Sequence, residues 1–166
     1  MKKFFLSFLT FMLLLCSLPY QVVLADELDL PAQSAIAVEA DTGKILYEKD
    51  SEKKRDVGGL STLLTTYLIF EAIHEKKLSL KDPIKLSEKA LALNDIEGAG
   101  TLPMEANQYT VEQLLTALLV GNSSTAALAL AEKVGGSEKS FVEKMKQKLS
   151  EWGIQSPHLI NATGLN

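Results

Sequence analysis

The pattern of apolar and polar positions begins with a short extended region. Residues 34–40 and 44–48 have the composition of strands, and Asp41-Thr42-Gly43 between them is typical of a tight turn. A β-hairpin with a glycine at the positive-φ position is therefore predicted. A charged loop follows over residues 49–56. This is the only strand pair that the pattern predicts, and a lone hairpin leaves both of its edges unpaired.

The chain is organised around residues 57–73. Small residues at 57–59 lead into apolar positions that repeat every three or four residues, namely Leu60, Leu63, Leu64, Tyr67 and Leu68. This spacing predicts a helix. Ile69 and Phe70 widen its apolar face, so we expect most of the helix surface to be covered by the rest of the protein. A helix N-terminus concentrates unpaired N–H groups and a positive dipole end, which suits nucleophile or anion chemistry.

The remainder of the chain is mostly helical. Residues 78–86 are expected to be extended, residues 87–93 to form one or two helical turns, and residues 94–104 to form a loop. A capping-box pattern at 110–113 begins a helix, and residues 122–125 end it and cap a second helix over 126–134. Gly135-Gly136 closes that helix, and Ser137 caps a third that runs to about Trp152. An α+β chain is predicted.

The N-terminus has the pattern of a secretory signal peptide. Two lysines precede a long apolar run, and the small residues of Val23-Leu24-Ala25 suit cleavage before Asp26. We therefore expect residues 1–25 to be removed and the mature chain to begin at residue 26. The protein is then exported and either extracellular or associated with the cell wall. The alternative is an uncleaved anchor, but polar residues and a proline interrupt the apolar segment before it reaches spanning length.

Composition excludes several classes of function. The formal charge is −4 at pH 7 and becomes −6 when Lys2 and Lys3 are removed, so no nucleic-acid partner is expected. Cys16 is the only cysteine, and the mature chain must be stable without disulfides. The two histidines, His74 and His158, lie far apart in sequence. No metal site and no cofactor are therefore expected.

Five blocks of the chain resemble one family, in the order in which that family has them. They are residues 34–47, 63–68, 109–115, 129–133 and 161–165. The chain resembles the N-terminal portion of the serine D-alanyl-D-alanine carboxypeptidases, the low-molecular-weight penicillin-binding proteins. The resemblance implies a partial penicillin-binding-protein or β-lactamase-like transpeptidase fold, with an N-terminal hairpin and a helical subdomain. Residues 26–166 would then be a truncated N-terminal part of such a domain, without its later strands.

The family carries an S-x-x-K motif at the start of the central helix. Three-residue spacing places the serine nucleophile and the lysine base on one face of the helix. Alignment of residues 63–68 puts Gly59 at the serine position and Thr62 at the lysine position. Ser61 is the nearby substitute hydroxyl, but Leu64 stands three residues beyond it and is no base. A literal S-x-x-K match at 51–54 lies in the charged loop and is interpreted as coincidence.

The family's second and third motifs are S-x-N and K-T-G. Alignment of residues 129–132 places Asn122-Ser123-Ser124 at the S-x-N position, so Asn122 and Ser124 are the candidate substrate-binding residues. The alternative is that these residues only cap the following helix. K-T-G, which holds the substrate carboxylate, would follow Asn166.

Three functional hypotheses follow. The first is an exported relative of the carboxypeptidases without turnover, because the serine and lysine are absent and the cleft wall and carboxylate anchor lie in the missing strands. The second is a binding or regulatory module at the cell wall, which holds a peptidoglycan stem peptide or β-lactam, or a protein partner that completes the sheet. The third keeps enzyme activity through Ser61 or Ser124, for which the sequence supplies no base.

Overall fold

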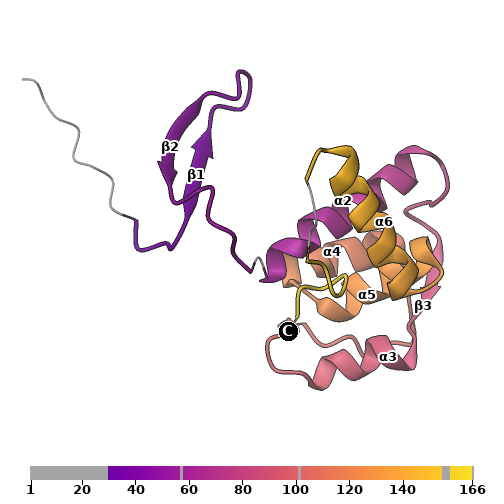
Figure 1. Cartoon of the computed structure of the whole chain (residues 1–166). Coiled ribbons are helices and arrows are strands. Elements are labelled where there is room, and N and C mark those ends of the chain that lie inside the picture. Colours follow the sequence, from indigo (N-terminus) through magenta and orange to yellow (C-terminus); the bar gives the residue numbers. More distant parts are fainter. Residues whose placement is uncertain (1–29, 57, 101, 155–157, 166) are drawn as a thin grey trace, which may run out of the picture. The chain divides into compact units, whose positions relative to one another are not determined.

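The computed structural model describes residues 30–56, 58–100, 102–154 and 158–165. The chain divides into two compact units, residues 1–54 and 55–166. Predicted features on residues 1–29, the signal peptide included, lie outside the described residues. Figure 1 shows the elements with their labels.

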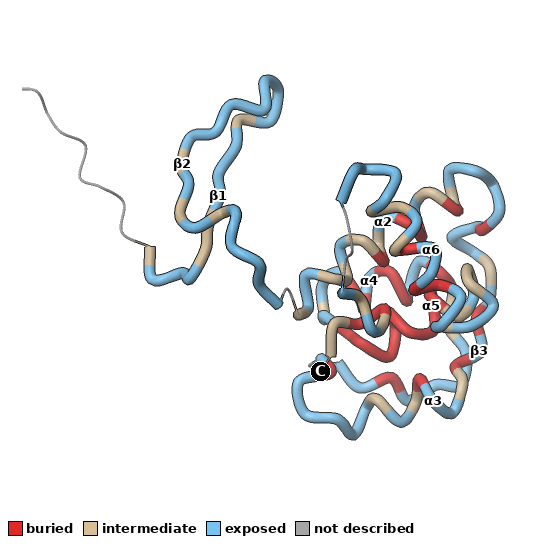
Figure 2. The backbone as a smooth tube through the Cα atoms, viewed as in Figure 1, coloured by how far each residue is buried: buried red, intermediate tan, exposed pale blue. Residues whose placement is uncertain are grey.

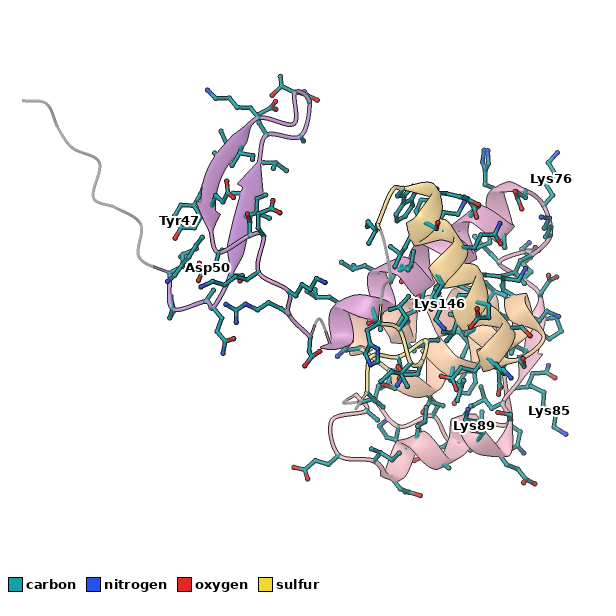
Figure 3. All side chains as sticks on the ribbon, in the orientation of Figure 1. Tyr47, Asp50, Lys76, Lys85, Lys89 and Lys146 are labelled. Carbon is teal, nitrogen blue, oxygen red and sulfur yellow. The ribbon has the colours of Figure 1, made fainter. Side chains whose placement is uncertain are left out.

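The first unit contains the predicted hairpin. Strand β1 (Ala35–Val38) pairs antiparallel with β2 (Ile45–Lys49), and the register shifts between Ala37 and Val38. The Glu39 carboxylate accepts hydrogen bonds from the Thr42 hydroxyl and from two backbone N–H groups of the turn. These bonds lower the pKa of Glu39, the Thr42 hydroxyl contributing most. Figure 3 labels Tyr47 of β2 and Asp50 just beyond it.

The second unit is a helical assembly around α5 (Ser124–Gly135). Helices α4 (Val111–Gly121) and α6 (Glu138–Glu151) both pack against α5, as does α2 (Ser61–His74). Residues 124–131 of α5 are all buried, and Figure 2 shows this helix at the centre of the buried region. Alanines at four of these positions let the neighbouring helices approach closely. The three helices predicted in the second half of the chain are confirmed.

Local capping explains where these helices begin and end. The Thr110 hydroxyl accepts from the Gln113 backbone N–H and the Gln113 side chain accepts from the Thr110 N–H, so the capping box begins α4 as predicted. Ser137 caps α6, which ends at Glu151, one residue before the predicted end. Gly136 follows α5 at φ +76°, a left-handed conformation that glycine adopts at low cost.

The structure contains a second strand pair that the sequence pattern does not predict. Strand β3 (Pro83–Lys85) pairs antiparallel with β4 (Gln108–Thr110), in a sheet separate from the hairpin. Each strand has three residues, too few to show a period of two, and their pairing spans a long intervening segment. That segment contains α3 (Glu88–Leu91) and the 3₁₀ turn η2 (Ala92–Asp95), where one or two helical turns were expected.

Helix α2 is buried on one side only, which corrects the expectation that most of its surface is covered. Its buried residues are Thr65, Leu68, Ile69 and Ala72. The opposite apolar positions, together with Leu60 just before the helix, are exposed, at 64% for Leu60, 63% for Leu63, 43% for Tyr67 and 47% for Phe70. We call these four residues the α2 stripe. The sequence pattern counted them as core, but α5 packs on the other side of the helix. The end of α6 reaches the stripe at Tyr67, whose ring meets the Trp152 ring edge-on with 4.9 Å between centroids.

Candidate functional site

The two positions aligned with the family's nucleophile and base lie in contact at the start of α2. Gly58–Leu60 forms a 3₁₀ turn, η1, that continues directly into the helix. The Thr62 hydroxyl donates a 2.6 Å hydrogen bond to the Gly59 carbonyl oxygen. The two residues are therefore brought together as the S-x-x-K spacing predicts. The pair, however, consists of a hydroxyl donor and a backbone acceptor, with neither a nucleophilic side chain nor a base.

The space above Gly59 is open. A Cβ atom built on this residue has no heavy atom within 4 Å, and its φ is not in the left-handed region. The backbone at this position therefore accepts a side chain without steric conflict. The fold retains room at the nucleophile position, although the sequence places glycine there.

Ser61, the substitute hydroxyl, is the first residue of α2 and is half-buried. Within the residues that the structure describes, its side chain makes no hydrogen bond, and Leu64 occupies the position one helical turn beyond. A serine hydroxyl acts as a nucleophile only when a neighbouring base accepts its proton. No such base contacts Ser61 in the described residues.

The segment 161–165 packs against the start of α2. The Asn161 side-chain oxygen accepts from the backbone N–H groups of Thr163 and Gly164, which folds the segment into a compact turn. Gly164 has φ +74°, and a Cβ atom there would overlap the Gly58 carbonyl oxygen. The turn therefore depends on a glycine to reach η1. The Asn-x-x-Gly pattern predicts a turn, but its contact with η1 is not visible in the sequence.

Two hydrogen bonds hold this turn in place. The Thr65 hydroxyl of α2 donates to the Ala162 carbonyl oxygen at 2.7 Å. The Glu138 carboxylate at the start of α6 accepts from the Ala162 backbone N–H at 3.2 Å. Glu138 also forms an ion pair with Lys89 of α3, and the hydrogen bond to Glu138 raises the pKa of Lys89. Figure 3 labels Lys89. Glu138 thus links the 161–165 turn to the start of α6 and to α3.

The residues at the S-x-N position form the turn between α4 and α5. Asn122 is exposed at φ +49° and ends α4, whereas the Ser123 hydroxyl accepts from the Ala126 backbone N–H and begins α5. Ser124 is buried, and its backbone N–H donates to the Ala99 carbonyl oxygen at 2.7 Å. The predicted capping role is thus carried by Ser123, the middle residue, while Asn122 and Ser124 flank it.

A cavity of about 220 Å³ lies beside this turn, between the 93–103 segment and Thr125. Asn94 shapes it by pairing with both backbone polar groups of Met104 and by accepting from the Thr125 hydroxyl at 3.0 Å. Gly100 approaches so closely that an added Cβ would lie 2.6 Å from the Asn122 carbonyl oxygen. Among the described residues, no hydrogen bond joins residues 58–62 to residues 122–124.

Within the described ranges, no three or more His, Cys, Asp or Glu side chains cluster as metal ligands would. His74 is exposed at the end of α2, and His158 is exposed as well.

In the part of the chain that the structure describes, no helix is both long and apolar enough to cross a membrane.

Comparison with known proteins gives a consistent assignment. The family model of the D-alanyl-D-alanine carboxypeptidases, peptidase family S11, matches residues 21–166. The D-alanyl-D-alanine carboxypeptidase DacF of Bacillus subtilis is 33% identical over 139 residues, which cover 84% of this chain and 35% of DacF. DacA of Escherichia coli, also a D-alanyl-D-alanine carboxypeptidase, is 25% identical over 82% of this chain and 35% of its own. The chain therefore spans about a third of the length of these curated relatives.

Solved structures of related proteins support the same family. A peptidoglycan synthesis regulatory factor (PBP3) from Streptococcus pneumoniae superimposes with a TM-score of 0.76 and 47% identity, covering 83% of this chain and 41% of that one. Penicillin-Binding Protein D2 from Listeria monocytogenes in an ampicillin-bound form gives a TM-score of 0.72 and 25% identity over 86% of this chain and 55% of that one. The predicted partial penicillin-binding-protein fold is thus confirmed. By sequence and by structure, the chain belongs to the family of D-alanyl-D-alanine carboxypeptidases.

Proposed function

We propose that this polypeptide is a catalytically silent member of the carboxypeptidase family. The observation that carries the proposal is the pair at the start of α2, where the Thr62 hydroxyl bonds the Gly59 carbonyl in place of a serine–lysine pair. Removal of a serine nucleophile lowers the rate of acyl transfer by several orders of magnitude. The Gly59 carbonyl oxygen is no nucleophile, and the Thr62 hydroxyl that donates to it has no basic side chain as its hydrogen-bond partner to take its proton, so this pair does not support formation of an acyl-enzyme.

Acylation by a fluorescent penicillin tests the proposal. The purified chain is incubated with the label and analysed on a denaturing gel and by intact mass, with circular dichroism to establish that it is folded. Penicillin-Binding Protein D2 from Listeria monocytogenes serves as the positive control. We expect no adduct. A stoichiometric adduct on this chain would contradict the proposal, and peptide mapping would then identify Ser61, Ser124 or another hydroxyl as the nucleophile.

A second candidate function is non-covalent binding at the cell wall. The exposed Asn122 and the cavity beside it favour this function, because both adjoin the position where the family has its S-x-N motif. The ligands that follow from the family are a peptidoglycan stem peptide and a β-lactam. Titration of the chain with an N-acylated D-Ala-D-Ala peptide, followed by heteronuclear NMR, is expected to shift the amides of residues 93–102 and 122–125. If these amides do not shift at millimolar concentrations of the peptide, this function is refuted.

A protein partner is the other form of this second function. The support is the exposed α2 stripe and the exposed side chains of Ile36, Val38, Ile45 and Leu46 on the hairpin. An extended segment of another polypeptide can form hydrogen bonds along the edge of a sheet and cover apolar surface at the same time. The probe is the part of Bacillus subtilis DacF that lies beyond its match to this chain. Co-expression should give a soluble complex that elutes as one species, and Leu63→Asp should abolish it. Separate elution of the two polypeptides would refute this partner.

We further propose that the chain is exported with cleavage after Ala25, on the evidence of the apolar run and the small residues that precede Asp26. Expression in a Gram-positive host and intact-mass analysis of the culture fluid and wall fraction test this. A product that begins at Asp26 is expected. A full-length product retained in the membrane fraction would identify an uncleaved anchor instead.

A further inference from the structure

A cavity of about 280 Å³ lies between the second half of α2, the end of α5 and α6. It is lined by residues from Leu68 onward on α2 and by none of residues 58–62 or 122–124. Its volume is close to the lower end of the range found for small-molecule sites, about 300 Å³. Neither the family's motifs nor the proposed function involves this region.

The floor of the cavity is apolar and one wall is fixed by charge. Leu68, Ala72 and Leu78 line it and are each 6% exposed. On α6, the Lys148 ammonium group lies 2.8 Å from Glu71 and 2.9 Å from Glu151, and only 17% of its side chain is exposed. Two carboxylates thus hold Lys148 in one position, which keeps this wall rigid and gives the three-residue cluster one net negative charge.

The rim carries two further cations that have no such partner. Lys133 lies in the last turn of α5 and Lys144 on α6, and both line the cavity with exposed side chains. Within the described residues, neither forms a salt bridge or a side-chain hydrogen bond. The acidic groups of the lining, Glu71, Glu75 and Glu151, are each paired with a lysine other than these two. The two rim lysines therefore carry two positive charges, whereas Lys148 with its two carboxylates carries one net negative charge, which leaves the lining as a whole with an excess of one positive charge.

We propose that this cavity binds a small organic anion with a short apolar chain, the chain against Leu68, Ala72 and Leu78 and the anionic group between Lys133 and Lys144. The apolar part gains from burial on the floor. The anionic group accepts charge-assisted hydrogen bonds from two ammonium groups that have no competing carboxylate. Carboxylates and phosphate monoesters share this chemistry, and the cavity is too small for a folded partner.

Amide-resolved NMR titrations of the purified chain test the proposal. The probes are hexanoate and hexyl phosphate, with acetate as a control for charge and 1-hexanol as a control for the apolar chain. Both six-carbon anions should shift the amides of residues 68–78, 133–134 and 144–151. Acetate and hexanol should bind at least about tenfold more weakly, because each lacks one of the two contributions. The head group that binds more tightly distinguishes a carboxylate ligand from a phosphate ligand.

Variants decide whether the rim lysines recognise the anion. Lys133→Ala/Lys144→Ala should weaken hexanoate binding about tenfold, by loss of two charge-assisted contacts. Lys139→Ala is the matched control, since Lys139 is also an exposed lysine of α6 but does not line the cavity. Unchanged affinity in the double variant would overturn the proposal. Equal binding of hexanol and hexanoate, or shifts centred on the α2 stripe, would overturn it as well.

Discussion

The Thr65 hydroxyl donates a 2.7 Å hydrogen bond to the Ala162 carbonyl oxygen, which joins α2 to a residue 97 positions later in the chain. Thr65 is fully buried, and Ala162 is fully buried as well. The bond therefore replaces solvation that neither group can obtain from water. Together with the Glu138 contact, it holds the 161–165 turn against the start of the helix that carries the family's nucleophile position.

Replacement of Thr65 by valine tests the strength of this link. Valine has nearly the same shape but leaves the Ala162 carbonyl oxygen without its donor, so the free energy of unfolding should fall by about 1–3 kcal/mol. Urea denaturation measures the change. Thr116→Val is the control, because the Thr116 hydroxyl donates to a backbone carbonyl on the exposed surface of α4. The control should change stability by less than about 0.5 kcal/mol. Equal effects of the two variants would contradict the assignment.

Gly164 is expected to be irreplaceable for a steric reason. Gly164→Ala places a methyl group against the Gly58 carbonyl oxygen and also strains the backbone at φ +74°. Gly136 has a similar φ of +76°, but the space that a Cβ would occupy there is open. Gly136→Ala should therefore cost only the conformational strain, about 1–2 kcal/mol, and Gly164→Ala should cost clearly more. Thermal unfolding of both variants measures the difference, and identical midpoints would show that the contact between the turn and η1 is absent.

The open space at Gly59 predicts that the family's residues fit this backbone. The free energy of unfolding of Gly59→Ser/Thr62→Lys should lie within about 0.5 kcal/mol of that of the original chain. Position 59 has free volume, and Thr62 is a half-exposed helical residue. Urea denaturation measures this, and labelling with fluorescent penicillin shows whether the pair is also sufficient for acylation. Destabilisation by more than about 2 kcal/mol would mean that the site has closed around glycine.

The turn between α4 and α5 separates a capping role from a ligand-binding role. Ser123→Ala removes the acceptor for the Ala126 N–H and should lower stability by about 1 kcal/mol. In the described residues, the Ser124 hydroxyl forms no hydrogen bond. Ser124→Ala should therefore change the free energy of unfolding by less than about 0.5 kcal/mol. Urea denaturation compares the two. A larger effect at Ser124 would indicate that the cap is misassigned.

Acid should destabilise the chain through two surface carboxylates. The hydrogen bond from Lys148 lowers the pKa of Glu151, and the hydrogen bond from Lys77 lowers the pKa of Glu75, from an ordinary value of 4.5. Both groups bind protons less readily in the folded chain. Their contribution is therefore present above pH 4.5 and is lost as the pH falls through their lowered pKa values.

The urea midpoint, measured at intervals from about pH 6 to about pH 3, should decrease over this window. Glu75→Gln/Glu151→Gln should reduce the slope, because both groups are then uncharged at every pH. An unchanged slope would mean that other carboxylates, such as Glu39 in the hairpin turn, determine the acid response.

Local pattern was sufficient for the features that depend on neighbouring residues. The Asp-Thr-Gly turn predicted the hairpin, and the Thr110–Gln113 box predicted the start of α4, because turns and caps are made by side chains within a few positions. The three-residue spacing of Gly59 and Thr62 is also local, and in the structure the Thr62 hydroxyl donates to the Gly59 carbonyl oxygen. The family resemblance was likewise carried by short blocks of sequence.

The tertiary structure decided what depends on residues far apart in the chain. Strand β3 lies in the segment that was expected to be extended, but its pairing with β4 was not predicted, because strands of three residues carry no pattern that specifies a distant partner. The α2 stripe has the same periodicity as the buried face, and only the packing of α5 against α2 shows which face is covered. The contacts of Gly164 with Gly58 and of Ala162 with Thr65 join the ends of this unit, and no local pattern specifies them. Sequence thus determined the hairpin, the main helices and the residues at the family's positions, whereas long-range packing determined the β3–β4 pair and which surfaces remain exposed.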